Sequence, residues 1–258
     1  MSRAFVFPGQ GSQAVGMGKE LAEAFPCARL VFEEVNEALK QKLSKLMFEG
    51  PEDELTLTEN AQPALMVVSM AAIAVLRIEG GIELPKVASF VAGHSLGEYS
   101  ALAAAGSFTL ADTARLLKIR GQAMQRAVPV GEGAMAALLG LDLEQAREVV
   151  AEAAKGDILA TANDNAPGQV VISGMREAVE RAVDVAKEKG AKRAMMLQVS
   201  APFHCPMMAP AADVMADALA DVNIDPPCVP LIANVTAAPV EDPVEIRRLL
   251  IEQVTGMV

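Results

Sequence analysis

The stretch VASFVAGHSLGEYSALAAA, residues 87–105, decides the fold. Val87–Ala92 is a continuous apolar run, as expected of a strand buried on both faces of a parallel sheet. Gly93–Gly97 matches the pattern G-x-S-x-G, and Glu98–Ala105 is predicted to be helical. In this context the glycines allow a sharp turn that projects the serine from the carboxyl edge of the sheet. The stretch predicts an α/β fold in which Ser95 is a nucleophile.

The segments on either side of this stretch extend the same core. Apolar runs predict strands, and apolar residues at helical spacing predict helices. The expected strands are Arg3–Phe7 and Val229–Asn234, and the expected helices are Lys19–Lys40, Thr58–Leu76, Thr109–Ala127, Pro206–Val222 and Pro243–Gln253.

The middle of the chain has a different pattern. Between Gly133 and Val199 the expected order is strand, helix, strand, strand, helix, strand, which is typical of a ferredoxin-like fold. We therefore predict an α/β core formed by residues 1–127 and 201–258, interrupted by a ferredoxin-like subdomain at residues 128–200.

Composition excludes several classes of protein. The 258 residues are 52% hydrophobic and 21% charged, which excludes wholesale disorder. Aromatic residues make up 3% and the net charge is −11, so binding to nucleic acid or to an anionic membrane is not expected. Three scattered cysteines without a CxxC pair predict neither a disulfide framework nor a zinc site. The N-terminus does not resemble a signal peptide, and Ala61–Leu76 is shorter than the roughly 20 residues of a membrane span. We expect a cytoplasmic protein.

A serine nucleophile needs a base, and the sequence offers two histidines. His94 lies inside the turn, where its ring cannot easily fold back onto Ser95. His204 lies in a loop bracketed by Pro202 and Pro206, and it is the favoured base. The alternative is that His204 is a surface or structural residue. No aspartate is singled out as a third member of a triad.

Arg120 occupies an unexpected position on its helix. It shares the apolar stripe of Leu116 and Met124, and no acidic residue lies three or four positions away. A guanidinium there needs an anion, which is either a distant carboxylate of the protein or the carboxylate of a ligand. If Arg120 faces the same cleft as Ser95, its planar fork suits a bidentate carboxylate.

The loop after the first strand, Phe7–Gln13, is rich in glycine. It fits the dinucleotide fingerprint only loosely, and it fails as a P-loop because Met17 stands where a lysine is required. Such a loop is better suited to present backbone N–H groups. We expect the Gln10 N–H to act as an oxyanion donor beside the N–H of Leu96 at the helix N-terminus.

Seven segments together resemble the malonyl-CoA:acyl-carrier-protein transacylase family of bacterial type II fatty acid synthesis. They occur in family order and cover essentially the whole chain: Phe7–Gln13, Gln62–Ala64, Gly93–Tyr99, Arg120–Gln125, Asn165–Gly174, Pro202–His204 and Glu252–Val254.

The resemblance implies a hydrolase-like core with an inserted ferredoxin-like subdomain. It also implies the role of each site residue. Ser95 would be the nucleophile, His204 the base and acid, and Arg120 the clamp for the malonyl carboxylate. The remaining implied residues are Gln10 and Leu96 in the oxyanion hole, Gln253 as the main-chain partner of the histidine, Phe203 as a residue of the malonyl-selecting form, and Gln62 and Asn165 in the pocket.

The implied reaction moves a malonyl group from malonyl-CoA to the phosphopantetheine thiol of acyl carrier protein, through a malonyl ester of Ser95. No bound cofactor and no metal are implied, and a monomer is expected. Two rival hypotheses remain: a serine acyl hydrolase or thioesterase with the same turn, and a non-catalytic binding protein that retains the fold.

Two further expectations concern the carrier protein and the end of the chain. An acidic carrier needs a local basic patch on a chain of charge −11, and two clusters are candidates: Lys187, Lys189, Lys192 and Arg193, or Lys118 and Arg126. Ordinary solvated helix faces are the alternative for both.

Family members continue past the segment that resembles Glu252–Thr255, so a truncated chain is expected.

Overall fold

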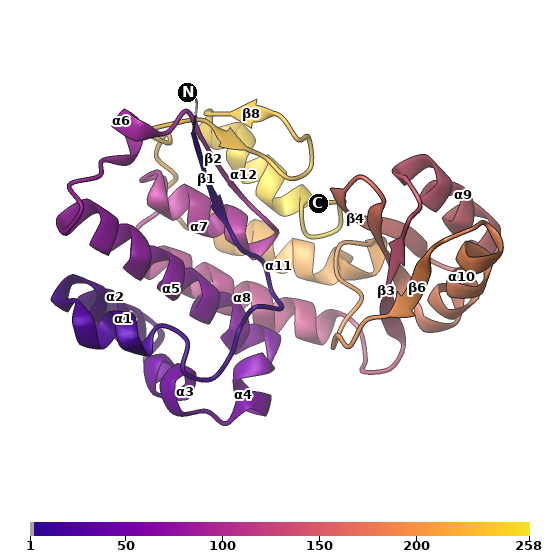
Figure 1. Ribbon diagram of the computed structural model, residues 1–258, viewed down its shortest axis with the longest axis horizontal. Coiled ribbons are helices and arrows are strands. Elements are labelled where there is room, and N and C mark those ends of the chain that lie inside the picture. Colours follow the sequence, from indigo (N-terminus) through magenta and orange to yellow (C-terminus); the bar gives the residue numbers. More distant parts are fainter. Residues whose placement is uncertain (1–2) are drawn as a thin grey trace. The chain divides into compact units, whose positions relative to one another are not determined.

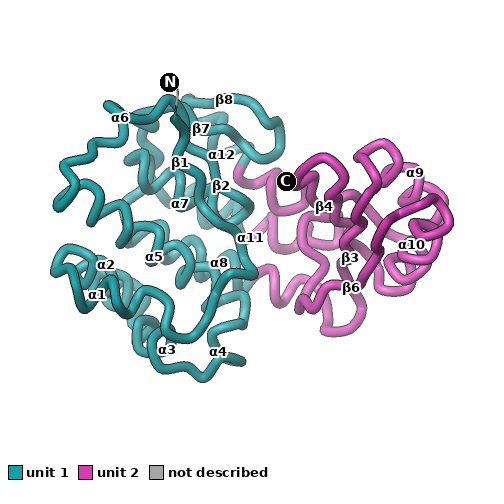
Figure 2. The backbone as a smooth tube through the Cα atoms, in the orientation of Figure 1, with its two compact units in different colours: residues 1–122, 215–249 teal, residues 123–214, 250–258 magenta. Residues whose placement is uncertain are grey.

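The computed structural model describes residues 3–258 and divides the chain into two compact units (Figure 2). Unit 1 comprises residues 1–122 and 215–249, and unit 2 comprises residues 123–214 and 250–258. Unit 1 holds a mainly parallel sheet and unit 2 an antiparallel one, so the predicted fold class is confirmed. The predicted domain limits at residues 128 and 200 stay a prediction.

The sheet of unit 1 has the strand order β1-β2-β7-β8. Strands β1 (Ala4–Phe7), β2 (Phe90–Gly93) and β7 (Leu231–Ile232) are parallel, and β8 (Pro239–Val240) pairs antiparallel with β7. In the register, Phe7 pairs with Gly93 and Ala92 pairs with Ile232. The carboxyl ends of three strands therefore meet at one edge, which is where sheets of this kind place their sites.

Helices of unit 1 pack beside this sheet, and Figure 1 shows α2 and α7 alongside α5. The helices are α1 (Lys19–Ala24), α2 (Pro26–Leu39), α3 (Leu43–Glu49), α4 (Glu52–Thr56), α5 (Thr58–Ile78), α6 (Leu84–Val87) and α7 (Leu96–Ala104). Three more contain a boundary between the units: α8 (Leu110–Ala127), α11 (Ala209–Ala220) and α12 (Pro243–Glu252).

Two predictions about these elements are wrong in detail. The expected single helix Lys19–Lys40 is broken, because Phe25 is extended and Pro26 starts a new helix. Proline has no N–H to donate and disfavours a helical residue before it. The expected strand Val87–Ala92 begins at Phe90, because Leu84–Val87 forms a short helix.

Helix α5 is 21 residues long, longer than the apolar run seen in the sequence. It is the one helix within residues 3–258 that is long and apolar enough to cross a membrane by length and composition, and 50% of its apolar window is buried. The core helix of a soluble protein passes the same test, and α5 packs against α2 and α7.

Unit 2 contains the predicted ferredoxin-like order. Strands β3 (Gly133–Leu139), β4 (Leu159–Ala166), β5 (Gln169–Met175) and β6 (Arg193–Met196) form an antiparallel sheet in the order β4-β5-β3-β6. Helices α9 (Leu143–Ala154) and α10 (Arg176–Glu188) pack against it. Buried apolar residues from both layers form one cluster, including Ala136, Leu138, Val149, Ile172 and Val179. A capping box at Asp142 and Gln145 starts α9.

Candidate active site

The turn that carries Ser95 is tightly constrained. Ser95 precedes α7 with φ 52° and ψ −109°, a region that a residue with a side chain seldom adopts. A Cβ on Gly93 would lie 1.9 Å from the carbonyl oxygen of Gly97, and one on Gly97 would lie 2.5 Å from that of Phe7. Both positions therefore require glycine. Backbone strain of this kind costs about 1–3 kcal/mol and persists only where the surroundings enforce it.

Asn234, in the loop after the neighbouring strand β7, forms hydrogen bonds on both sides of the turn. Its Oδ1 accepts a hydrogen bond from the Ser95 N–H at 2.8 Å, and its Nδ2 donates to the Gly93 carbonyl at 2.7 Å. Its own N–H donates to Glu98 Oε1 at 3.2 Å. Sequence reasoning did not single out Asn234. The available signal was a polar residue ending the expected strand Val229–Asn234, whose carboxyl end lies at the same edge as Ser95.

Arg120 points to Ser95. The side chain is 1% exposed; Nη1 donates to Gln62 Oε1 at 2.8 Å and Nη2 to Ser95 Oγ at 3.1 Å. The guanidinium also lies 5.7 Å from the centre of the Tyr99 ring. Burial lowers the pKa of Arg120, while Tyr99 and Glu98 raise it. A guanidinium stays charged in proteins, so unit 1 holds a buried cation beside the serine hydroxyl.

Close packing of α8 on α5 brings Arg120 to Gln62. A Cβ on Gly121 would lie 2.5 Å from the Cα of Glu59, so the next residue along α8 must be glycine for this approach. Lys118 Nζ lies 3.1 Å from Glu59 Oε2, and Gln122 Nε2 donates to the same oxygen at 2.9 Å. These contacts fix the register between the two helices.

The first loop packs against the serine turn. A Cβ on Gly9 would lie 2.7 Å from His94 Nδ1, and the His94 N–H donates to the Phe7 carbonyl at 3.1 Å. The side chain of Gln10 reaches Thr58 Oγ1 at 3.4 Å. The Leu96 N–H is the first of α7, where no carbonyl of the same helix can accept it. The segments of both predicted oxyanion donors thus lie at the same edge of the sheet.

His204 lies in unit 2 and is held by the main chain of the residue that follows the last helix, α12. Its side chain is buried, its φ is 57°, and Nδ1 lies 2.8 Å from the Gln253 carbonyl oxygen. A carbonyl can only accept, so Nδ1 carries the proton and Nε2 is left as the basic nitrogen. Cys205 fixes the turn by donating its thiol to the Pro202 carbonyl, and burial raises the pKa of that thiol.

Two more predicted residues lie in unit 2. Phe203 packs against the small buried cluster of Met135, Ala162 and Val171. Asn165 is exposed, next to the end of β4. The structure thus brings Ser95, Arg120, Gln62 and the segments of Gln10 and Leu96 together in unit 1. It places His204 with the Gln253 carbonyl in unit 2.

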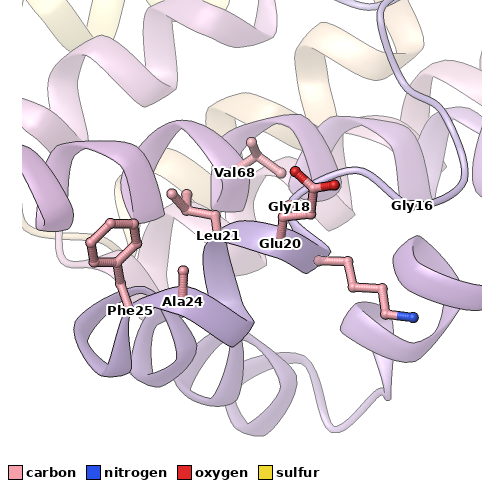
Figure 3. A pocket seen from close by; sticks show the side chains of 8 residues that line it. Gly16, Gly18, Glu20, Leu21, Ala24, Phe25 and Val68 are labelled. Atoms are coloured by element: carbon pink, nitrogen blue, oxygen red, sulfur yellow. The ribbon is translucent and has the colours of Figure 1, made fainter.

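A cavity of about 660 Å³ in unit 1 lies elsewhere (Figure 3). It contains none of the predicted site residues and is lined by Gly16, Gly18, Lys19, Glu20, Leu21, Ala24, Phe25 and Val68. No group of three or more potential metal ligands occurs in the part of the chain that the structure describes.

A serine on a strand–turn–helix unit, with a fixed cation at its hydroxyl, defines a class of enzyme that transfers acyl groups through a serine ester. Comparisons with known proteins agree with this class. The family described as "Acyl transferase domain" matches residues 4–249. The malonyl CoA-acyl carrier protein transacylase of Bacillus subtilis is 49% identical over 251 residues, covering 97% of this chain and 78% of that protein.

Solved structures give the same result. The acyl-carrier-protein-S-malonyltransferase of Bartonella henselae superposes with a TM-score of 0.97 at 60% identity, covering 100% of this chain and 82% of that one. A malonyl-transacylase solved with its type II PKS acyl-carrier protein superposes with a TM-score of 0.95 at 44% identity, covering 100% and 82%. The chain belongs to the malonyl CoA-acyl carrier protein transacylase family.

Proposed function

We propose that this chain transfers a malonyl group from malonyl-CoA to the phosphopantetheine thiol of acyl carrier protein, through a malonyl ester of Ser95. The observation that carries the proposal is the buried Arg120 guanidinium, 3.1 Å from Ser95 Oγ. A cation fixed beside the nucleophile suits an acyl group that ends in a carboxylate. Family membership supports the same choice of substrate.

In the first half-reaction, Ser95 Oγ attacks the thioester carbonyl while His204 Nε2 takes the hydroxyl proton. The Gln253 carbonyl holds the other ring nitrogen protonated and stabilises the imidazolium that forms. The N–H groups of Gln10 and Leu96 stabilise the oxyanion. The C–S bond then breaks, and the CoA thiolate takes the proton from the imidazolium.

In the second half-reaction, the carrier thiol replaces CoA. His204 takes the thiol proton, the thiolate attacks the malonyl-Ser95 carbonyl, and the ester C–O bond breaks. The serine oxygen regains its proton from His204. Water competes with the thiol at this stage, and exclusion of water decides whether the enzyme transfers or hydrolyses.

The resemblance to the family assigns the other predicted residues to the acyl pocket. Gln62 orients Arg120 through its hydrogen bond, and Phe203 and Asn165 are the residues expected to select the malonyl group and to line the pocket. We expect a cytoplasmic monomer without a bound cofactor or metal, with acyl carrier protein as its macromolecular partner.

Labelling with malonyl-CoA followed by a chase tests the proposal. Intact-protein mass spectrometry should show one malonyl adduct on the wild-type chain and none on S95A. Holo-acyl carrier protein should then remove the adduct much faster than buffer does. Faster loss to water would instead identify a hydrolase. Absence of any adduct on the folded wild-type chain would identify a non-catalytic member of the fold.

A further inference from the structure

We infer that Asn234 is a positioning residue for the nucleophile, and that Glu98 in turn holds Asn234. The inference rests on the proposed role of Ser95. Asn234 lies 139 residues after Ser95 in the chain and belongs to none of the segments that carry the family resemblance.

The side-chain amide of Asn234 bridges the turn that carries Ser95. Asn234 Oδ1 accepts from the Ser95 N–H at 2.8 Å, and Nδ2 donates to the Gly93 carbonyl at 2.7 Å. An amide side chain presents an acceptor and a donor side by side, which the two backbone groups require. The bridge therefore fixes the peptide groups before and after His94.

The bridge resists strain in the turn. Ser95 has a positive φ, and the flanking glycines add no side chains that could hold the turn. A strained residue keeps its conformation only when its neighbours enforce it. The two hydrogen bonds of the Asn234 amide, one accepted from Ser95 and one donated to Gly93, enforce this conformation, and so they set where Ser95 Oγ points relative to Arg120.

Asn234 is itself held in place by Glu98. Its N–H donates to Glu98 Oε1 at 3.2 Å, and the Glu98 N–H donates to the Ser95 carbonyl at 3.0 Å. Glu98 is 1% exposed and lies in the first turn of α7, where a negative charge is favourable. Its charge also raises the pKa of Arg120. Glu98 thus links the loop after β7 to the cation that faces the nucleophile.

The test separates positioning of the nucleophile from a merely structural bond between strands. We compare wild type, N234A, N234D and the control T236A, whose exposed side chain lies in the same loop. The readouts are the rate of Ser95 labelling by a small fluorophosphonate, the rate of malonyl-Ser95 formation at saturating malonyl-CoA, the half-saturating concentration, and the melting temperature.

We expect N234A to slow both rates by a similar factor of at least about ten, because small misplacements of a reacting group have large effects on rate. The half-saturating concentration should change less than twofold, and T236A should match wild type. N234D keeps the acceptor for Ser95 but sets a carboxylate against the Gly93 carbonyl, so its rates should lie between those of wild type and N234A.

Wild-type rates in folded N234A, whatever its melting temperature, would overturn the inference. Should N234A not fold, N234D decides by the same comparison, and a wild-type rate there overturns the inference as well. Failure of the proposed function has a different signature: in the wild-type chain, malonyl-CoA would leave no adduct on Ser95, or the adduct would be lost to water rather than to the carrier. The effect of N234A on the fluorophosphonate rate would still test the inference.

Discussion

The two sheets of this molecule differ in length, direction and content. The parallel sheet of unit 1 has strands of two to four residues, whereas the antiparallel sheet of unit 2 has strands of four to eight. Each parallel strand is short, and the loop that follows it begins at the same edge of the sheet. Those loops carry Ser95, Gln10 and Asn234. Short strands therefore supply the positions from which functional groups project.

Both units bury apolar and polar side chains, but the buried carboxylate and guanidinium, those of Glu98 and Arg120, belong to unit 1. Beside the serine, unit 1 buries Glu98, Arg120 and Gln62, all polar or charged. Unit 2 has an apolar cluster between its sheet and helices, including Leu138 and Ile172. Buried polar groups oppose folding unless they are well paired, whereas apolar burial stabilises it. We therefore predict that substitutions beside the serine act mainly on the chemistry, whereas substitutions in the apolar core of unit 2 act mainly on stability.

His204 is the group that breaks this division, because it belongs to unit 2. We predict that H204A lowers the rate of malonyl transfer by about 10²–10⁴-fold, the usual contribution of a general base. Stopped-flow acylation and carrier-protein chase would measure both half-reactions. The control is C205S, which keeps a donor for the Pro202 carbonyl in the same turn. Near-wild-type transfer by H204A would remove His204 from its proposed role.

A substitution in the core of unit 2 tests whether that unit contributes to stability without affecting the chemistry of Ser95. Ile172 is fully buried in β5, so I172A should lower the free energy of unfolding by about 2–5 kcal/mol, and I172V by about 0.5–1.5. Chemical denaturation measures this, with Q169A at an exposed position of the same strand as the control. Below the melting transition, Ser95 of I172A should label at the wild-type rate. A labelling rate that falls in step with stability contradicts the division.

The features that could be predicted from the sequence are those formed by residues close together in the chain. The serine turn was predictable because its strand, glycines and helix are adjacent in the chain. The ferredoxin-like order was predictable because α9, α10 and their strands are long and periodic. The break at Phe25–Pro26 was missed because apolar spacing continues across it, although the proline was itself a signal.

Contacts between residues far apart in the sequence could not be predicted from it. The position of Arg120 on an apolar stripe left two explanations open, an internal carboxylate or a ligand. Contacts with Gln62 and Ser95, 58 and 25 residues away, place the guanidinium at the nucleophile. The Asn234 bridge depends on the register between β2 and β7, which no local pattern encodes. Contacts of this kind can be recognised only once the packing of the helices and the pairing of the strands are known.

Arg120 tests whether the polar interior of unit 1 serves the substrate. We predict that R120A slows acylation by malonyl-CoA by about 10–100-fold, equivalent to the loss of a charge-assisted pair. Acetyl-CoA should be affected much less, since its acyl group has no carboxylate. Mass-spectrometric acylation rates with both thioesters measure the ratio, and R126A, at an exposed position of the same helix, is the control. Equal losses with both thioesters contradict the clamp.

The smallest effect is expected at the surface of unit 2, where the carrier protein would dock. Among the candidate basic residues, Lys187 pairs with Asp184, and Lys189 with Glu148 and Glu152. Lys118 is likewise bound to Glu59. Lys192 and Arg193, at the start of β6, are exposed.

An acidic partner gains most from cations that are not already neutralised by neighbours. Lys192 and Arg193 are therefore the better candidates, because they are adjacent and both exposed, whereas the exposed Arg126 has only the paired Lys118 as its cluster partner. We predict that K192E/R193E weakens carrier-protein binding about three- to tenfold at low salt, and less at high salt because surface charges are screened. Calorimetry at two ionic strengths measures this. Acylation by malonyl-CoA should stay unchanged, because that step needs no carrier. The control is R147E, an exposed cation paired with Glu144 in the same unit. An equal loss in the control would show that only net charge matters and that unit 2 has no docking patch at β6.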